Sequence, residues 1–155
     1  MSGQIEARLK KLGIVLPPSG APVGNYVATM IAGDLLYVSG QLPRREDGSL
    51  MTGTLGGGCG LADGQAAARA CGLSILVQAK AELGDLERIR QVVKLTGFVA
   101  CTADFTEHPQ VVNGASDLMV EVLGDRGRHT RAALGVASLP GGAAVEVEAI
   151  IAIGA

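Results

Sequence analysis

The last apolar segment of the chain, residues 145–153, restricts the fold more than any other feature. Its sequence is VEVEAIIAI, in which every second residue from Val145 is apolar and Glu146 and Glu148 fall between them. This alternation predicts a β-strand with both carboxylates on one face. From the strand alone, two interpretations stay open: a solvated outer face, or a pair of carboxylates with a chemical role.

A cation precedes this strand. Arg131 stands near the head of a run of small and apolar residues, 130–140, and a glycine turn follows at Gly141 and Gly142. We expect a strand from Arg131, joined through that turn to residues 145–153 as its hairpin partner. Arginine binds carboxylates through two parallel hydrogen bonds and keeps its charge when partly buried. The pattern therefore predicts either a structural salt bridge to one of the two glutamates or a site that holds a small acid.

The other segments predict one mixed domain. The chain has 155 residues, enough to bury a substantial core. We expect a helix over 2–12 capped by Ser2, strands at 26–31 and 35–39 around a Gly33-Asp34 turn, a helix over 63–83 capped by Asp63, a strand at 92–102 and a helix over 109–123. The order ββ-α-β-α-ββ predicts an α+β fold, with one β-sheet covered on one face by two helices. The other face then needs cover, which favours self-association.

Composition excludes several classes of function. The net charge of −2 gives no electrostatic footprint for nucleic acid. No apolar run reaches the roughly 18 residues of a membrane span. Cys59, Cys71 and Cys101 are too widely spaced for a disulfide framework or a zinc site, which favours a reducing, cytoplasmic setting. His108 and His129 lack a metal-ligand spacing, and the sequence supports no Cys-His or Ser-His-Asp arrangement. The polar, glycine-rich residues 44–60 predict a surface loop.

Four further residues are weaker candidates for a functional site. Ser39 and Gly40 end the second strand, where a glycine either admits a ligand or marks an ordinary strand exit. Tyr26 is either a core ring or a pocket wall. Asn113 lies within a predicted helix, although asparagine is a poor helix former.

Taken together, these residues resemble the YjgF/RidA family, the reactive intermediate deaminases that are also described as L-PSP endoribonuclease-like. The resemblance covers the chain from about residue 24 onward. It rests on the segments GNYV at 24–27, VSGQLP at 38–43, Asn113, Arg131 with VASLP at 136–140, and VEVEA at 145–149. Residues 1–23 form an N-terminal arm. The arm and the glycine-rich loop at 48–60 resemble a longer branch of the family.

The resemblance implies a chorismate-mutase-like fold and a homotrimer with clefts between subunits. Arg131 would then bind the carboxylate of a small substrate, and Glu146 would orient water. The remaining site residues would be Tyr26, Ser39, Gly40, Asn113 and the backbone of Ala133. Many members carry cysteine at the position of Ala133.

The implied activity is hydrolytic deamination of enamine or imine acids of the 2-aminoacrylate type, without metal or organic cofactor. The alternatives are a non-catalytic trimeric binding or regulatory module and an endoribonuclease-like protein. The fold also suggests a chorismate mutase, but the chain has too few matching cations for a dicarboxylate. We expect no nucleic acid or membrane partner.

Overall fold

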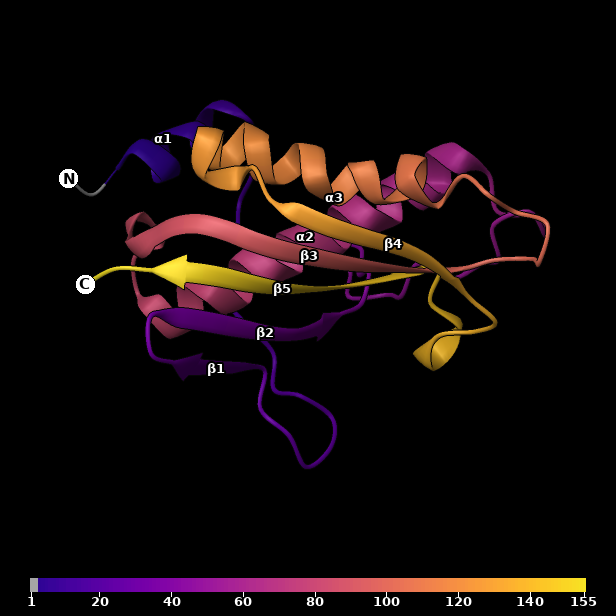
Figure 1. Ribbon diagram of the computed structural model, residues 1–155, viewed down its shortest axis with the longest axis horizontal. Coiled ribbons are helices and arrows are strands. Elements are labelled where there is room, and N and C mark those ends of the chain that lie inside the picture. Colours follow the sequence, from indigo (N-terminus) through magenta and orange to yellow (C-terminus); the bar gives the residue numbers. More distant parts are fainter. Residues whose placement is uncertain (1–2) are drawn as a thin grey trace.

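The computed structural model describes residues 3–155, which form one sheet with helices on one face (Figure 1). The strands are β1 Thr29–Ala32, β2 Leu35–Gln41, β3 Ile89–Ala100, β4 Thr130–Val136 and β5 Val145–Ile153. The helices are α1 Gln4–Lys11, α2 Leu61–Leu83 and α3 His108–Leu123. Short 3-10 turns occur at Leu86–Arg88, Gly124–Gly127 and Pro140–Gly142. The predicted α+β class and element order are confirmed.

The strand order corrects one prediction about the sheet. The order is β1-β2-β5-β3-β4, in which β5 pairs antiparallel with both β2 and β3, and β4 pairs parallel with β3. The predicted hairpin between the Arg131 strand and β5 is therefore wrong. Alternate residues of β5, from Val145 to Ile153, are buried, so this strand belongs in the middle of the sheet, whereas the more exposed β4 suits an edge.

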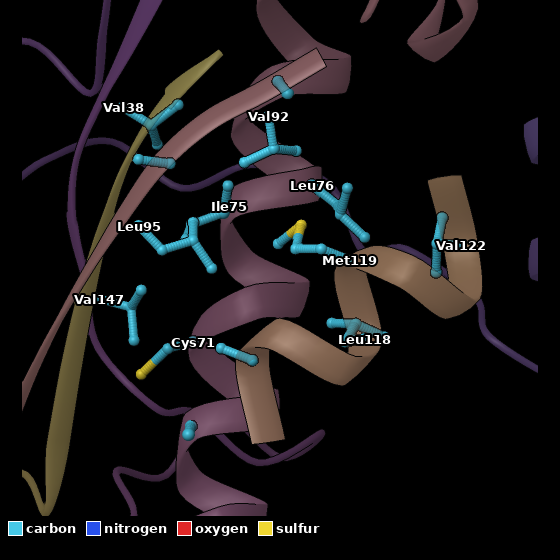
Figure 2. Packing of buried hydrophobic residues seen from close by; sticks show 14 of the residues in the cluster. Val38, Cys71, Ile75, Leu76, Val92, Leu95, Leu118, Met119, Val122 and Val147 are labelled. Carbon is cyan, nitrogen blue, oxygen red and sulfur yellow. The ribbon is translucent and has the colours of Figure 1, made fainter. Parts of the chain in front are cut away.

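Two helices cover the apolar face of the sheet. Helices α2 and α3 pack on each other and on this face, and aliphatic side chains from both meet those of β3 and β5 (Figure 2). Ile75, Leu95 and Met119 are fully buried there. Each such side chain contributes about 1.5–3 kcal/mol through its burial. The helices approach closely at Gly114, where a Cβ would lie 2.1 Å from the carbonyl oxygen of Gln65.

The hairpin of β1 and β2 turns at Gly33, which has the positive φ of 63° that the sequence predicts for this position. The first strand begins at Thr29, however, so Tyr26 lies in the loop before it. Helix α2 stops at Gly84, as expected, but it begins at Leu61. Asp63 therefore lies in the first turn and does not cap the helix.

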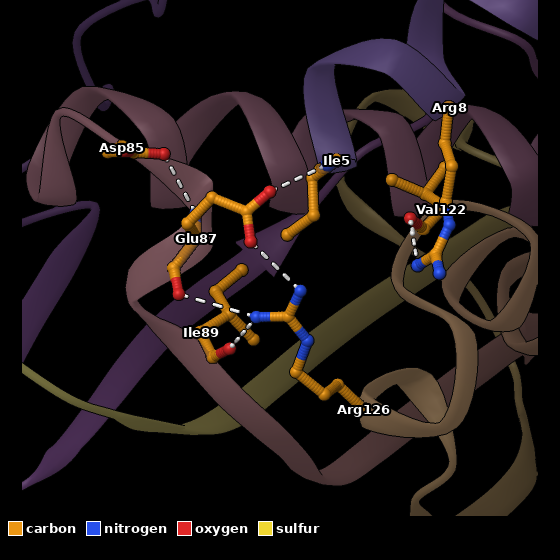
Figure 3. A network of polar contacts seen from close by, with 7 residues as sticks. All are labelled: Ile5, Arg8, Asp85, Glu87, Ile89, Val122 and Arg126. Atoms are coloured by element: carbon orange, nitrogen blue, oxygen red, sulfur yellow. Dashed lines mark hydrogen bonds and ion pairs between the residues drawn. The ribbon is translucent and has the colours of Figure 1, made fainter. Parts of the chain in front are cut away.

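Helix α1 is fixed to the end of the helical layer by a polar network (Figure 3). The Glu87 carboxylate accepts a hydrogen bond from the backbone N–H of Ile5 at 2.7 Å and pairs with Arg126 at 3.0 Å. The N–H of Ile5 lowers the pKa of Glu87, and Arg126 lowers it further. Ile5 and Leu9 are buried in the common core. The predicted N-cap, Ser2, lies outside the described residues.

The glycine-rich loop is held against the end of β3. Leu55 is fully buried, its N–H donates to the Ala100 carbonyl at 2.9 Å, and its own carbonyl accepts from Thr102 N–H at 3.0 Å. The predicted surface loop is therefore anchored at Leu55.

The second face of the sheet is not covered by any helix of residues 3–155 (Figure 1). Met30 and Tyr37 are exposed apolar side chains of β1 and β2. Because this face carries apolar surface beside charged groups, it suits contact with another protein surface.

Candidate functional site

Arg131 points to the helical layer from the edge strand β4. It lies opposite the fully buried Leu95, which places it on the face covered by α3. Its Nη1 donates to Asn113 Oδ1 at 2.7 Å and to Ser116 Oγ at 3.0 Å. Within residues 3–155, no group accepts a hydrogen bond from Nε or Nη2 of Arg131, and no carboxylate pairs with it. The salt bridge to Glu146 or Glu148, one of the two interpretations from sequence, is therefore not formed within this part of the chain.

Ser116 connects this arginine to a histidine. The His129 ring lies with Nδ1 2.6 Å from the Gly127 carbonyl oxygen and Nε2 2.8 Å from Ser116 Oγ. A carbonyl can only accept, so Nδ1 carries a hydrogen, and in the neutral ring Nε2 accepts from the serine hydroxyl. The serine oxygen is then free to accept from Arg131. The arginine is thus held by neutral groups that leave its positive charge uncompensated.

Glu146 lies on the other side of the sheet. Its neighbours Val145 and Val147 are fully buried toward the helices, so the Glu146 side chain points to the face without helices. Burial raises the pKa of this carboxyl, and the neighbouring Glu148 raises it further. The carboxylate occupies the space beside Gly40, where a Cβ would lie 2.1 Å from Glu146 Oε1. Gly40 therefore has a structural reason to lack a side chain.

Glu148 is more exposed and lines a hollow of about 350 Å³ on the same face. Lys94 and Thr96 of β3 and Tyr37 and Ser39 of β2 also line it. Glu146 is not among the lining residues. The two carboxylates thus share a face but differ in surroundings: one is partly buried against Gly40, and the other lies in the hollow.

Some of the other predicted site residues lie near Arg131, and the rest lie near the start of the sheet's β1–β2 edge. Asn113 binds Arg131 directly, and Ala133 lies two residues along the same row of β4. The Ser39 hydroxyl donates to the Val27 carbonyl at 2.7 Å, beside the loop that carries Tyr26. Tyr26 is 54% exposed, which rules out a core ring in this chain.

Ser116 and His129 were not predicted as site residues from the sequence. Ser116 is three residues after Asn113, a spacing that puts both on one face of a helix. His129 stands two residues before Arg131, the spacing of one strand face. These spacings are visible in the sequence, but only the packing of α3 on β4 shows that Ser116 contacts both His129 and Arg131.

The comparisons with known proteins agree with this fold. Residues 6–148 match the model of the family described as "YjgF/chorismate mutase-like, putative endoribonuclease". The chain belongs to this family. Its resemblance to YjgF/RidA proteins, inferred from short segments, is therefore confirmed, as is the chorismate-mutase-like α+β fold.

Three similar proteins illustrate the range of the family. Protein TCP17 of Trypanosoma cruzi is 52% identical over 97% of this chain and 94% of its own length. A "putative endoribonuclease" from Shewanella oneidensis is 34% identical and superimposes with a TM-score of 0.93, covering 97% of this chain and 100% of the other. RidA from an Antarctic Psychrobacter is 29% identical with a TM-score of 0.62, covering 87% and 94%.

The described residues hold neither a metal-binding cluster nor a helix suited to crossing a membrane. Among residues 3–155, no group of three or more His, Cys, Asp or Glu side chains is arranged to hold a metal ion. None of the helices in the same range combines the length and apolar character needed to cross a membrane.

Proposed function

We propose that the protein hydrolyses small enamine and imine acids of the 2-aminoacrylate type to a 2-keto acid and ammonia. The observation that carries this proposal is a half-buried arginine held by neutral oxygen atoms, with no carboxylate partner among residues 3–155. Membership of the YjgF family and the similarity to RidA support the same activity.

Arg131 binds the substrate carboxylate. Both of its hydrogen bonds use Nη1, so the edge formed by Nε and Nη2 remains available for a bidentate contact. Asn113 and Ser116 fix the direction of this edge before the substrate arrives. Such a fixed contact places C2 of the substrate where water can reach it.

Glu146 serves as the proton acceptor. The enamine first takes a proton at C3 and loses one from its nitrogen, which converts it to the imine. Water then adds to C2, while the Glu146 carboxylate accepts a proton from it. That proton passes to the nitrogen and gives the carbinolamine. The carbinolamine hydroxyl then gives its proton, through Glu146, to the nitrogen, so the C–N bond breaks as the C=O bond forms, ammonia leaves and the 2-keto acid remains. Burial raises the pKa of Glu146, which makes its carboxylate a better base than an exposed one.

The proposed site needs two copies of the chain. Arg131 and Asn113 lie on the helical side of β4, whereas Gly40 and Glu146 lie on the opposite side of the sheet. Two groups on opposite faces of one sheet cannot contact the same small molecule. The homotrimer that the family resemblance implies would set the β4 edge of one chain against the uncovered sheet face of the next. The exposed apolar Tyr37 on that face supports such a contact.

Arg131→Ala, compared with Arg128→Ala, tests the proposal. Arg128 is a matched control because its side chain is 71% exposed and, among residues 3–155, pairs only with Asp125. Freshly generated 2-aminoacrylate-type acid is mixed with each protein, and keto acid and ammonia are measured. We expect the wild type and Arg128→Ala to accelerate release, and Arg131→Ala to lose on the order of 10²-fold or more in kcat/KM.

A wild-type rate equal to that of buffer overturns the proposal. Carboxylate binding that depends on Arg131 without turnover would then indicate a non-catalytic binding module, which the alanine at 133 favours. Cleavage of RNA that survives repurification and is lost in Arg131→Ala would indicate an endoribonuclease instead.

A further inference from the structure

Cys101 and His108 form a contact that imine hydrolysis does not use. Cys101 directly follows β3, and His108 is the first residue of α3. The Cys101 sulfur lies 3.4 Å from His108 Nε2. Both side chains are partly exposed. A thiol and an imidazole at this distance are the two parts of an activated sulfur nucleophile.

Three neighbouring groups hold this pair in place. A Cβ on Gly135 would lie 2.5 Å from His108 Nε2 and 2.7 Å from the Cys101 sulfur, so only glycine leaves room for both. The Phe105 ring packs against the His108 ring edge-on, with centroids 5.5 Å apart. The Cys101 N–H donates to the Val136 carbonyl at 3.2 Å. The contact is therefore built into the fold at the junction of β3, β4 and α3.

The other two cysteines lack this arrangement. Cys71 is fully buried, and burial raises its pKa well above the ordinary value. Cys59 is partly exposed, but burial and then the charge of Asp63 raise the pKa of its thiol, and its nearest polar contact is the Gly60 carbonyl at 3.9 Å. Among the three, Cys101 alone combines access with a nitrogen base. Reactive cysteines are distinguished by these two properties.

We propose that Cys101, with His108 as its base, is a site of oxidation by small hydroperoxides such as hydrogen peroxide. His108 Nε2 takes the thiol proton, and the thiolate attacks one oxygen of the peroxide. The S–O bond forms as the O–O bond breaks, so the sulfur is oxidised to sulfenic acid and the peroxide is reduced. The leaving hydroxide takes the proton from His108 and becomes water. Exposed carboxylates at Asp104 and Glu107 flank the pair, which favours an uncharged reagent.

Dimedone trapping tests this proposal on the intact protein. The wild type, His108→Gln and Cys101→Ser are treated with hydrogen peroxide and dimedone, and the label on each cysteine is followed by mass spectrometry. In the wild type we expect Cys101 to be labelled about tenfold faster than Cys59 or more, and Cys71 to stay unlabelled. In His108→Gln the Cys101 rate should fall about tenfold or more, with the Cys59 rate unchanged.

Two results would overturn the proposal. One is a Cys101 rate no higher than that of Cys59 in the wild type, a comparison that needs no variant to fold. The other is an unchanged Cys101 rate in a His108→Gln protein whose circular dichroism and melting temperature match the wild type. Neither result bears on imine hydrolysis, because Arg131 and Glu146 take no part in the oxidation.

Discussion

Gly40 leaves open the space that the Glu146 carboxylate occupies, so Gly40→Ala displaces that carboxylate directly. A Cβ at residue 40 would lie 2.1 Å from Glu146 Oε1 and 2.9 Å from Cδ. The backbone of Gly40 is not in the left-handed region, so alanine is allowed there without strain. The steric clash is therefore relieved by movement of the Glu146 side chain.

The size of the displacement follows from ordinary contact distances. Contacts of a Cβ become ordinary at 3.4 Å, so Oε1 has to retreat by about 1.3 Å. A misplacement of about 1 Å can reduce turnover by about 10²-fold. The unfolding free energy should change by only about 1 kcal/mol or less, because rotation of the glutamate side chain relieves the contact.

The assay measures keto-acid release by Gly40→Ala and by the control Gly20→Ala. A Cβ at residue 20 would meet no atom within 4 Å, so the control adds the same methyl group without a conflict. We expect kcat to fall about 10²-fold in Gly40→Ala alone, with melting temperatures of all proteins within about 4 °C. A Gly40→Ala protein that keeps the kcat of an active wild type would refute the assignment of the proton acceptor to Glu146 at this position.

Three further predictions concern the arginine, the arm and the core. Ser116→Ala should raise KM for the imino acid several-fold through looser placement of Arg131, and an unchanged KM in steady-state kinetics would contradict this role. The Ile5 N–H and Arg126 lower the pKa of Glu87 in the folded state. The ionised carboxylate therefore stabilises the fold fully above the unfolded-state pKa of about 4.3, and this stabilisation is lost as the pH falls through the lower, folded-state pKa. Urea unfolding at several pH values should therefore show that Glu87→Gln is destabilised by about 1–3 kcal/mol at pH 7 and by less at pH 3. The control variant Glu6→Gln removes the exposed salt bridge to Lys80, and it should change the unfolding free energy by at most about 1 kcal/mol. Met119→Ala should cost about 2–5 kcal/mol in the same urea assay, and a smaller loss would mean that the core collapses around the cavity.

Local signals in the sequence predicted most element boundaries well. Gly33 and Gly84 have the positive φ angles that a tight turn and a helix end require, and Pro109 lies in the first turn of α3, where a missing N–H costs nothing. These features depend on a few adjacent residues, so the sequence contains all the information they need.

The buried side of α2 could not be predicted in the same way. Helical spacing from Val77 puts Ala66 and Ala81 on one face, but both are exposed, whereas Ala67 and Cys71 are buried. The helix is rich in small apolar residues on nearly all sides, so its periodicity does not select one face. Packing against the sheet and α3 decides which side is buried.

Strand pairing between distant segments was the least predictable feature, and it changes how the site is understood. A glycine turn before β5 favoured a hairpin with β4, which would have put Arg131 beside Glu146 and Glu148. In the folded chain β3 lies between β4 and β5, and the cation and the carboxylates point to opposite faces. A salt bridge to either glutamate would have neutralised the charge of Arg131. Because the strand order separates these groups, they do not pair with each other within residues 3–155, and the proposed function therefore requires a second copy of the chain to bring them together.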